Sequence, residues 1–383
     1  MNRQWVILLA AMLVTFVTGS VHSFSVFVLP LESLLKLPRS EISLIYSFAL
    51  VGITVAVLFG YRYYASLRAG WLVLASCLTA ALGLLLAASA QQWWQLFAGY
   101  SVMFGVSNGI AYGFSLQLVG REMPGRKGFA MGAVTAAYAV GSIVFSYLFA
   151  ATIDDSSVSG AFHLLAVGLV ICGLLAALMM HLARADYGRV ELADVATSSG
   201  IDSAKIMHYW LAYMTSVFAG LMAIGHAAGI AVDKGASLEL STLSAMIIGI
   251  GSAGGGFLAG WLIDRWPPKR FLVGLPLLSA LALLLTALVD EAAVIVGLLS
   301  LVGFSYGSII AIYPVVISND FGDLGAKAYG RIFTAWGFAG LVAPWVAGLV
   351  FDWQAGYQLA LLLAAVTAVS SALIASRLAI RIP

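Results

Sequence analysis

Long hydrophobic runs, each broken by charges, proline or glycine, make up nearly the whole chain. A bilayer core of about 30 Å needs roughly 20 apolar residues per helix. Runs of this length must be helices, because unpaired backbone groups are costly in lipid and barrel strands are only about ten residues long. The pattern predicts twelve membrane-spanning helices, at about residues 5–29, 41–62, 70–90, 93–119, 127–152, 160–183, 206–231, 240–263, 271–289, 292–317, 328–351 and 357–378.

One hydrophilic stretch, residues 184–205, interrupts this pattern. It carries charged residues and the Ser198-Ser199-Gly200 triplet, without the apolar periodicity of a packed element. Residues 1–183 and 206–383 lie on its two sides as near-equal halves. We therefore predict two six-helix bundles joined by a linker.

The composition supports a membrane protein and adds no cysteine chemistry. Charged residues make up 9% and hydrophobic residues 62% of the chain, against about 25% and 45–50% in soluble domains. The two cysteines, Cys77 and Cys172, lie in apolar runs far from any histidine cluster, so neither a disulfide framework nor a metal site is indicated. The first apolar run continues for more than 20 residues from Trp5 without a small-residue cleavage site, which argues against a cleavable signal peptide.

The distribution of Lys and Arg between alternate loops predicts the orientation. With the N-terminus inside, sixteen basic residues fall on the cytoplasmic side and only Lys36, Arg39 and Lys234 on the other. We expect both termini and the linker to be cytoplasmic. The compact loops and short termini favour a bacterial inner membrane.

The second half of the chain repeats features of the first at an offset near 200 residues, which is the signature of a duplication. The repeated segments are residues 105–109 and 303–307 (Gly-x-Ser-x-Gly), 60–64 and 260–265, and 125–127 and 325–327. The polar residue inside the first motif changes from Asn108 to Tyr306. The two predicted bundles are therefore parallel repeats.

Two six-helix halves repeated in parallel and joined by a cytoplasmic loop are the architecture of the major facilitator superfamily. The segment from Gly260 to Arg270 resembles the signature that follows helix eight in that superfamily, although Tyr64 stands where the first-half copy would carry Asp. This resemblance covers the whole chain. It implies an all-α membrane fold with a substrate site between the halves and alternating access.

Shorter segments resemble the oxalate/formate antiporter and monocarboxylate transporter group, namely residues 25–31, 126–132, 313–322, 329–330, 333–337 and 339–340. That group carries Asn-x-x-Gly-Arg in helix eight, and its Arg pairs with the substrate carboxylate. This chain has Gly256 at the Arg position. A dicarboxylate would then bring two charges into a cavity without fixed cations, at a cost of several kcal/mol per ion, so oxalate exchange is disfavoured. A monocarboxylate carried with a proton, or a neutral or amphipathic compound, stays possible.

Polar side chains deep in the predicted spans are the candidate substrate contacts, because polar groups in the membrane interior are expensive and commonly functional. Asn108 and Tyr112 share one helical face. An imidazole can bind a substrate oxygen or take a proton near working pH, but a neutral one can also simply brace two helices. The predicted substrate-binding residues are His22, Asn108, Tyr112, Tyr138, His226, Tyr306 and Tyr313.

A second candidate group lies at the predicted cytoplasmic surface. The superfamily resemblance implies that Asp264, with Arg265, meets the positively polarised N-terminus of the fifth span near Arg126 and Lys127 when the cytoplasmic side closes. We predict that these four residues form a conformational latch.

These observations predict a proton-coupled secondary transporter of a small monocarboxylate-like metabolite. Two alternatives stay open, an exporter of a neutral or amphipathic compound and a membrane sensor that binds without transport. The sequence has no nucleophile elbow, HExxH-type zinc motif or nucleotide-binding loop, so an enzyme is disfavoured. We expect a monomer without cofactor, metal ion or nucleic-acid partner.

Overall fold

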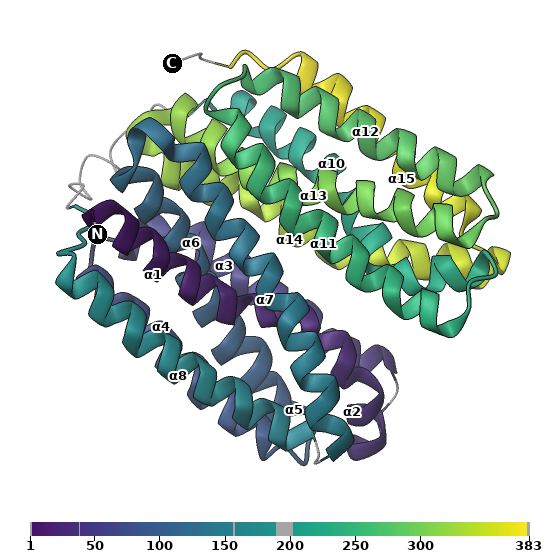
Figure 1. The fold of residues 1–383 in the computed structure, drawn as a ribbon, viewed down its shortest axis with the longest axis horizontal. Helices are drawn as coiled ribbons and strands as arrows, with labels where there is room; N and C mark the ends of the chain where they lie inside the picture. Colours follow the sequence, from purple (N-terminus) through teal and green to yellow (C-terminus); the bar gives the residue numbers. More distant parts are fainter. Residues whose placement is uncertain (1, 38, 156–157, 189–201, 381–383) are drawn as a thin grey trace. The chain divides into compact units, whose positions relative to one another are not determined.

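The computed structural model describes the chain except residues 1, 38, 156–157, 189–201 and 381–383. Within the described part, every regular element is a helix (Figure 1). The elements before residue 189 are α1 (Arg3–Thr18), η1 (Gly19–Phe27), α2 (Val28–Leu35), α3 (Arg39–Tyr63), α4 (Ala69–Ala88), α5 (Trp93–Leu96), η2 (Phe97–Phe104), α6 (Gly105–Glu122), η3 (Pro124–Arg126), α7 (Lys127–Asp155) and α8 (Val158–Leu182). The elements after residue 201 are α10 (Ser203–Asp233), α11 (Leu238–Ile263), α12 (Pro268–Leu288), α13 (Ala292–Phe321), η4 (Gly322–Leu324), α14 (Gly325–Gln354) and α15 (Gln358–Ser376).

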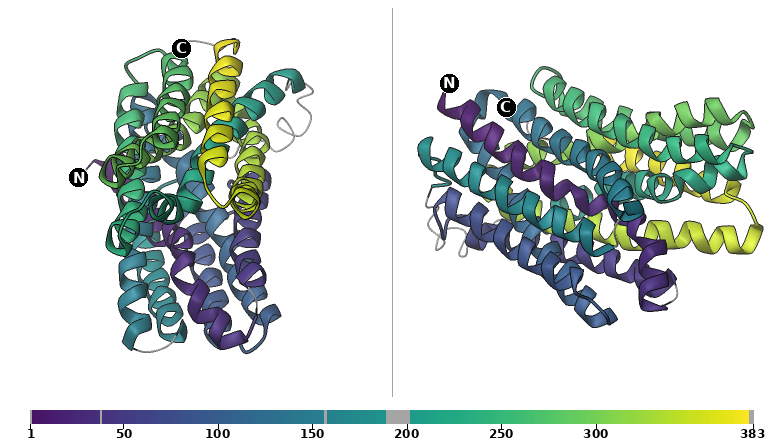
Figure 2. Two further views of the ribbon diagram at one scale, coloured as in Figure 1. Left: turned by 90° about the vertical axis from the view of Figure 1, so that its right-hand side faces the viewer. Right: turned by 60° about the horizontal axis from the view of Figure 1, so that its bottom comes forward.

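The predicted number of membrane-length helices is confirmed. In the described residues, 11 helical stretches are long and apolar enough to cross a membrane, and one of them, Ala292–Phe351, contains both α13 and α14. Counting these two helices separately gives the twelve predicted spans. In each unit the long helices lie side by side (Figure 2), so each span buries part of its apolar surface against its neighbours.

Two predicted spans are not single regular helices. The first span passes from α1 into the 3-10 helix η1, where hydroxyl groups compete for backbone carbonyls: Thr18 donates to Val14 O at 3.0 Å and Ser20 to Val17 O at 2.7 Å. The fourth span contains the π-helical segment η2 between α5 and α6. The hydrophobic pattern predicts the length of a span but does not predict these local changes from α-helix to 3-10 or π-helix.

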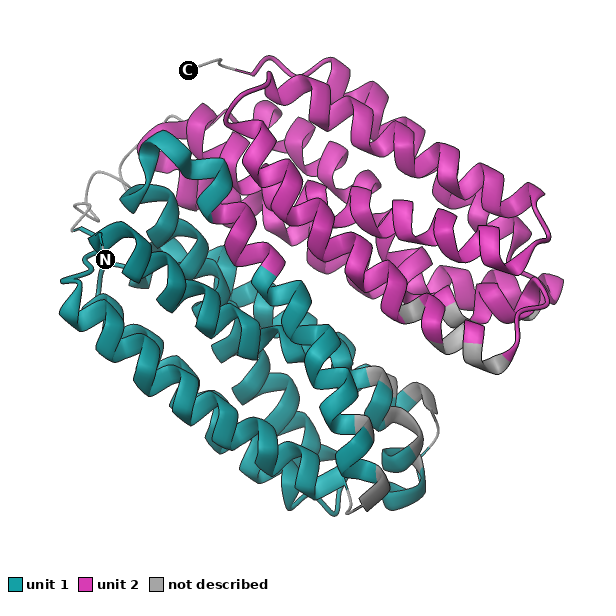
Figure 3. Ribbon diagram, viewed as in Figure 1, with its two compact units in different colours: residues 1–130, 137–198 teal, residues 131–136, 199–383 magenta. Residues whose placement is uncertain are grey.

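The chain divides into two compact units (Figure 3). Unit 1 comprises residues 1–130 and 137–198, and unit 2 comprises residues 131–136 and 199–383. The change of unit at residues 198 and 199 lies inside the predicted linker, and the short segment 131–136 of α7 groups with unit 2. Most of the linker, residues 189–201, lies outside the described residues.

The two described ends of the predicted linker, residues 184–188 and 202–205, make defined contacts. Arg121 donates to the Tyr187 carbonyl at 2.8 Å and its guanidinium lies 4.0 Å from the centre of the Tyr187 ring. Burial raises the pKa of the Tyr187 phenol, so the ring packs as a neutral group. At the other end, Asp202 caps α10 by accepting from the backbone amide of Ala204 at 2.9 Å. Residues 203–205, which the sequence places in the linker, therefore belong to a helix.

The repeat is visible in how the helices pack. In unit 1, α6 crosses α3 where a Cβ on Gly109 would overlap the backbone of Ile53, and in unit 2, α13 crosses α11 where a Cβ on Gly307 would overlap the backbone of Ser252. The two glycines are 198 positions apart (307 − 109) and their partners 199 (252 − 53). Equivalent small residues therefore bring equivalent helices into close contact in both units.

Candidate functional site

Four of the seven predicted substrate residues come together in unit 1. Their centre is Asn108 on α6, which is fully buried. Its amide Nδ2 donates to the Thr18 carbonyl at 2.6 Å. Thr18 is the last residue of α1, where the chain changes to the 3-10 winding of η1. Asn108 thereby ties α6 to the junction of α1 and η1.

Tyr138 of α7 connects the members of this cluster. Its hydroxyl donates to Asn108 Oδ1 at 3.2 Å. Its ring centre lies 4.9 Å from that of Tyr112 and 5.5 Å from that of His22, which it meets edge to face at an interplanar angle of 77°. The sequence placed Asn108 and Tyr112 on one helical face, and both contact the same tyrosine.

His22, in η1, binds a residue that the sequence analysis missed. Its Nδ1 lies 2.7 Å from the hydroxyl of Tyr46 on α3. The Tyr46 ring is in turn stacked on Phe24 with 5.7 Å between ring centres. A tyrosine hydroxyl can donate to a neutral imidazole nitrogen or accept from a protonated one, so the His22–Tyr46 contact can serve either protonation state. Tyr46 lies within the second predicted span, and that depth was the available signal.

We call the five residues His22, Tyr46, Asn108, Tyr112 and Tyr138 the His22 cluster. They come from η1, α3, α6 and α7. The bonds and ring contacts among them use imidazole, amide and phenol groups without a fixed charge. Such a set can donate and accept hydrogen bonds to a small oxygen-bearing solute, and its imidazole can hold a proton.

His226 of α10 lies in unit 2 with both ring nitrogens engaged. Nδ1 lies 3.0 Å from the Tyr357 hydroxyl, and Nε2 lies 2.8 Å from the Pro344 carbonyl. A carbonyl only accepts, so Nε2 carries the hydrogen and Nδ1 can accept from Tyr357. The amide of Tyr357 is fixed by Asp233 Oδ2 at 3.1 Å. His226 therefore ties α10 to α14 and to the start of α15, as a bracing imidazole would.

Tyr306 and Tyr313 of α13 have different partners. Trp336 donates from Nε1 to the Tyr306 hydroxyl at 2.8 Å, so Tyr306 presents a phenol already joined to α14. Tyr313 is buried and stacked on Tyr213 with 4.3 Å between ring centres. The described contacts of His226, Tyr306 and Tyr313 do not join them into one cluster comparable with that of unit 1.

A buried carboxylate in unit 2 was not singled out from the sequence. The side chain of Asp320, in the last turn of α13, is fully buried. Its Oδ2 accepts from the Tyr209 hydroxyl at 2.8 Å and lies 2.7 Å from Lys205 Nζ. The sequence analysis counted Lys205 as a linker charge, and only the fold places it against Asp320.

The predicted latch residues occupy helix ends. In unit 1, Arg126 ends η3 and Lys127 begins α7. In unit 2, Asp264 follows the last residue of α11 as its C-cap, and Arg265 donates to the Trp261 carbonyl at 2.8 Å with its guanidinium 3.9 Å from the Trp261 ring centre. The interaction between the two pairs stays a prediction.

The family and its relatives fit this architecture. The model of the Major Facilitator Superfamily matches residues 9–344. The chain is 24% identical over 356 residues to the MFS-type transporter YhjX of Escherichia coli (strain K12), which covers 89% of this chain and 86% of that protein. It is 21% identical over 393 residues to the oxalate:formate antiporter of Oxalobacter formigenes, covering 96% and 89% of the two chains.

Solved structures share the fold at low sequence identity. The proton:xylose symporter XylE superposes with a TM-score of 0.73 at 15% identity over 97% of this chain and 94% of its own. The Escherichia coli fucose:proton symporter FucP superposes with a TM-score of 0.68 at 17% identity over 98% of both chains. The described residues contain twelve membrane-length helices, with packing that repeats between two units, and the family match covers residues 9–344. The chain is therefore an integral multi-pass membrane protein that belongs to the major facilitator superfamily.

Proposed function

We propose that the protein is a proton-coupled secondary transporter of a small monocarboxylate-like metabolite, and that the His22 cluster binds the substrate. The transporter acts as a monomer in the bacterial inner membrane. Both termini are cytoplasmic, an orientation that the distribution of basic residues favours. It works by alternating access, the mechanism of carriers with this repeat architecture.

One observation carries the proposal: His22, Asn108, Tyr112 and Tyr138 form a linked polar cluster inside membrane-length helices. Isolated polar side chains in a membrane helix commonly bond their own backbone. Those of the His22 cluster instead join four elements. Polar groups at that depth are costly, so their gathering in one place favours a ligand site over scattered structural bonds.

The chemistry of the cluster suits a singly charged acid. Phenol and amide hydrogens can bind carboxylate oxygens. His22 can take up the proton that cancels the charge of the substrate, with Tyr46 positioned to accept from the imidazolium. This assignment removes the need for the arginine that Gly256 replaces.

The relatives support the class but not the substrate. The antiporter of Oxalobacter formigenes is named for two carboxylates, and the two structural neighbours are named as proton symporters of sugars. Carboxylate transport and proton coupling thus both occur among proteins with this fold. The combination is our proposal for this chain.

The test is flux in proteoliposomes containing the purified protein. A panel of monocarboxylates is offered under an acid-outside gradient, with protein-free vesicles as the control for passive leak. Saturable, gradient-driven uptake of at least one acid is the expected result. The proposal would be contradicted if the protein moved no acid in the panel although a cooperative thermal unfolding transition showed it to be folded. The next candidates would then be the exporter of a neutral or amphipathic compound and the sensor.

A further inference from the structure

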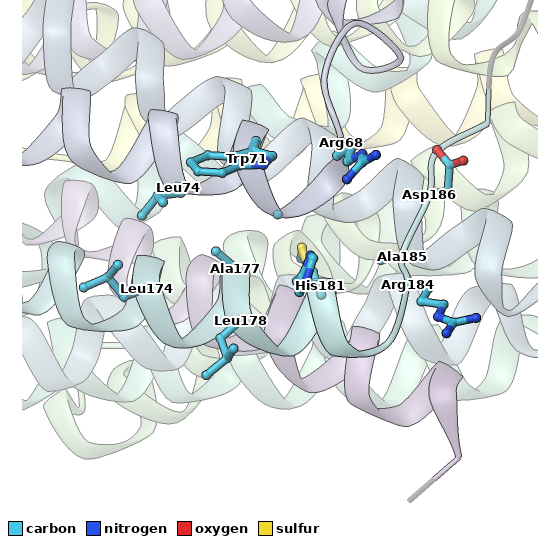
Figure 4. A pocket seen from close by; sticks show the side chains of 12 residues that line it. Arg68, Trp71, Leu74, Leu174, Ala177, Leu178, His181, Arg184, Ala185 and Asp186 are labelled. Carbon is cyan, nitrogen blue, oxygen red and sulfur yellow. The ribbon is translucent and has the colours of Figure 1, made fainter.

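A groove of about 540 Å³ lies on unit 1 between the start of α4 and the end of α8 (Figure 4). Both helices are of membrane-crossing length. The apolar walls are open: Trp71 is 63% exposed, Leu174 52% and Leu178 54%. This groove is separate from the His22 cluster, since none of the residues lining it belongs to that cluster.

The shape of the groove follows from small residues at the helix crossing. A Cβ on Gly70 would lie 2.9 Å from the Ala177 carbonyl oxygen, so the backbones of α4 and α8 approach closely. Ala177 adds only a methyl group, while Trp71, Leu174 and Leu178 rise on the sides. The result is an apolar channel along the crossing of α4 and α8.

Positive groups gather at one end of this channel. Figure 4 shows Arg68 and Arg184 near His181 at the end away from Leu74 and Leu174. Arg68 is also the N-cap of α4, and no described side chain caps the amides that follow it, so the positive end of the helix faces the same region.

An acidic side chain, Asp186, also lines the mouth, and its Oδ1 accepts from the Gly188 amide at 3.1 Å. The mouth thus combines one carboxylate with two guanidinium groups and the N-terminus of a helix. Its net charge is therefore positive, which suits an anionic head group.

The backbone at Arg184 adds an independent observation. Its φ is +51°, in the left-handed region that side chains rarely adopt. The amide of Ala185 donates to Met180 O at 2.8 Å and the amide of Arg184 to His181 O at 3.0 Å, which is the hydrogen-bond pattern of a Schellman cap. Glycine is the usual residue at this position. An arginine at this position disfavours the left-handed backbone conformation, but it places a cation at the groove mouth.

We propose that this groove binds an anionic phospholipid of the surrounding membrane. Its phosphate lies at the end of the groove that carries Arg68 and Arg184, and one acyl chain runs along Trp71, Leu174 and Leu178. Basic pockets between membrane helices bind anionic head groups through the same combination of charge and apolar wall. With the predicted orientation, the lipid belongs to the cytoplasmic leaflet.

The test is native mass spectrometry of the full chain in detergent. The protein is incubated with equal amounts of phosphatidylglycerol and phosphatidylcholine that carry identical acyl chains. We expect preferential retention of phosphatidylglycerol by the wild type. Arg68→Gln and Arg184→Gly should each lower it about fivefold, since a basic residue at an anionic surface contributes about that factor. Arg270→Gln, which removes an exposed charge from unit 2, should leave retention unchanged.

Two further variants and measurements separate the proposal from simpler explanations. Arg184→Gly should unfold at or above the wild-type temperature, because glycine accepts the left-handed turn, so lost lipid cannot be attributed to misfolding. Ala177→Leu fills the channel while keeping both arginines, and it should lower retention as well. Three outcomes would each overturn the lipid site. The first is equal retention by wild type and Arg184→Gly, and the second is a loss of the same size in Arg270→Gln. The third is displacement of the lipid by millimolar inorganic phosphate when Ala177→Leu has no effect on retention.

Discussion

The ammonium group of Lys205 lies 2.7 Å from Oδ2 of Asp320, and so ties the first turn of α10 to the last turn of α13. Arg3 and Glu122 form the corresponding pair of unit 1, also at 2.7 Å, between α1 and α6. The pairs join the first and fourth long helices of each repeat. They differ in exposure. The acid is 0% exposed in Asp320 and 10% in Glu122, and the base is 24% exposed in Lys205 and 52% in Arg3.

This difference predicts unequal costs for the same substitution. Lys205→Met removes the Lys205 cation from the buried carboxylate of Asp320, which also accepts from the Tyr209 hydroxyl, and should lower the free energy of unfolding by about 3 kcal/mol. Arg3→Met leaves a Glu122 carboxylate whose side chain is 10% exposed and so keeps some contact with water, and it should cost less than Lys205→Met. Denaturation of both variants in the same detergent measures the two losses. Equal losses would show that burial of Asp320 does not govern the strength of the pair.

The His22–Tyr46 contact predicts a change in the pH dependence of transport. If His22 holds the transported proton, His22→Ala should flatten the rise of gradient-driven uptake at acidic pH. Tyr46→Phe keeps the aromatic ring but removes the hydroxyl that lies 2.7 Å from Nδ1, and should shift the profile rather than abolish it. Uptake by reconstituted variants between about pH 5 and 8, the range over which histidine changes charge, checks both. Wild-type profiles in both variants would remove His22 from the coupling mechanism.

His226 allows a contrasting prediction. Its bonds to Tyr357 and to the Pro344 carbonyl are those of a brace. His226→Ala should therefore lower stability by about 1–3 kcal/mol, since it removes two part-buried hydrogen bonds worth about 0.5–1.5 kcal/mol each. Tyr357→Phe removes only the bond to Nδ1 and should cost less. Thermal unfolding of the two variants measures the effect. Unchanged stability together with lost substrate binding would instead place His226 among the substrate contacts, as the sequence analysis expected.

The helices were predictable because the cost of exposed backbone in lipid leaves few choices, and run length alone then locates each span. The predicted span 41–62, for example, is α3 at Arg39–Tyr63. Asn108 and Tyr112 could also be paired from their spacing on one face. Such arguments use interactions within one helix, where the sequence separation fixes the geometry.

Partners from other helices could not be predicted in this way. Tyr46 lies 24 residues from His22, and Tyr357 lies 131 residues from His226. Helical spacing says nothing about which tyrosine in another span faces a given imidazole. Asp320 is at a helix end, where charges are ordinary, and only the fold shows that Lys205 and Tyr209 of α10 contact it. The depth of a polar residue was readable from the sequence, and its partner was not.

The latch predicted from the superfamily resemblance can be tested by Asp264→Asn. The substitution removes the charge but keeps the size, so the balance between the two states of the carrier should shift while substrate affinity stays close to the wild type. We expect turnover in proteoliposomes to fall several-fold with little change in the concentration for half-maximal uptake. Asp323→Asn, an exposed acid in η4, is the control. Normal turnover, or loss of binding, in Asp264→Asn would contradict the latch.

Two adjacent glycines of α11 give a stability test with its control built into the chain. A Cβ on Gly255 would overlap the Phe304 carbonyl oxygen of α13, whereas a Cβ on Gly254 would meet nothing within 4 Å. Gly255→Ala must therefore push α11 and α13 apart, and should cost about 1–3 kcal/mol. Gly254→Ala changes only helix propensity, and should stabilise by up to about 1 kcal/mol. Thermal unfolding of the two variants in one detergent decides the matter. Effects of the same sign would mean that close backbone contact does not hold these two helices together.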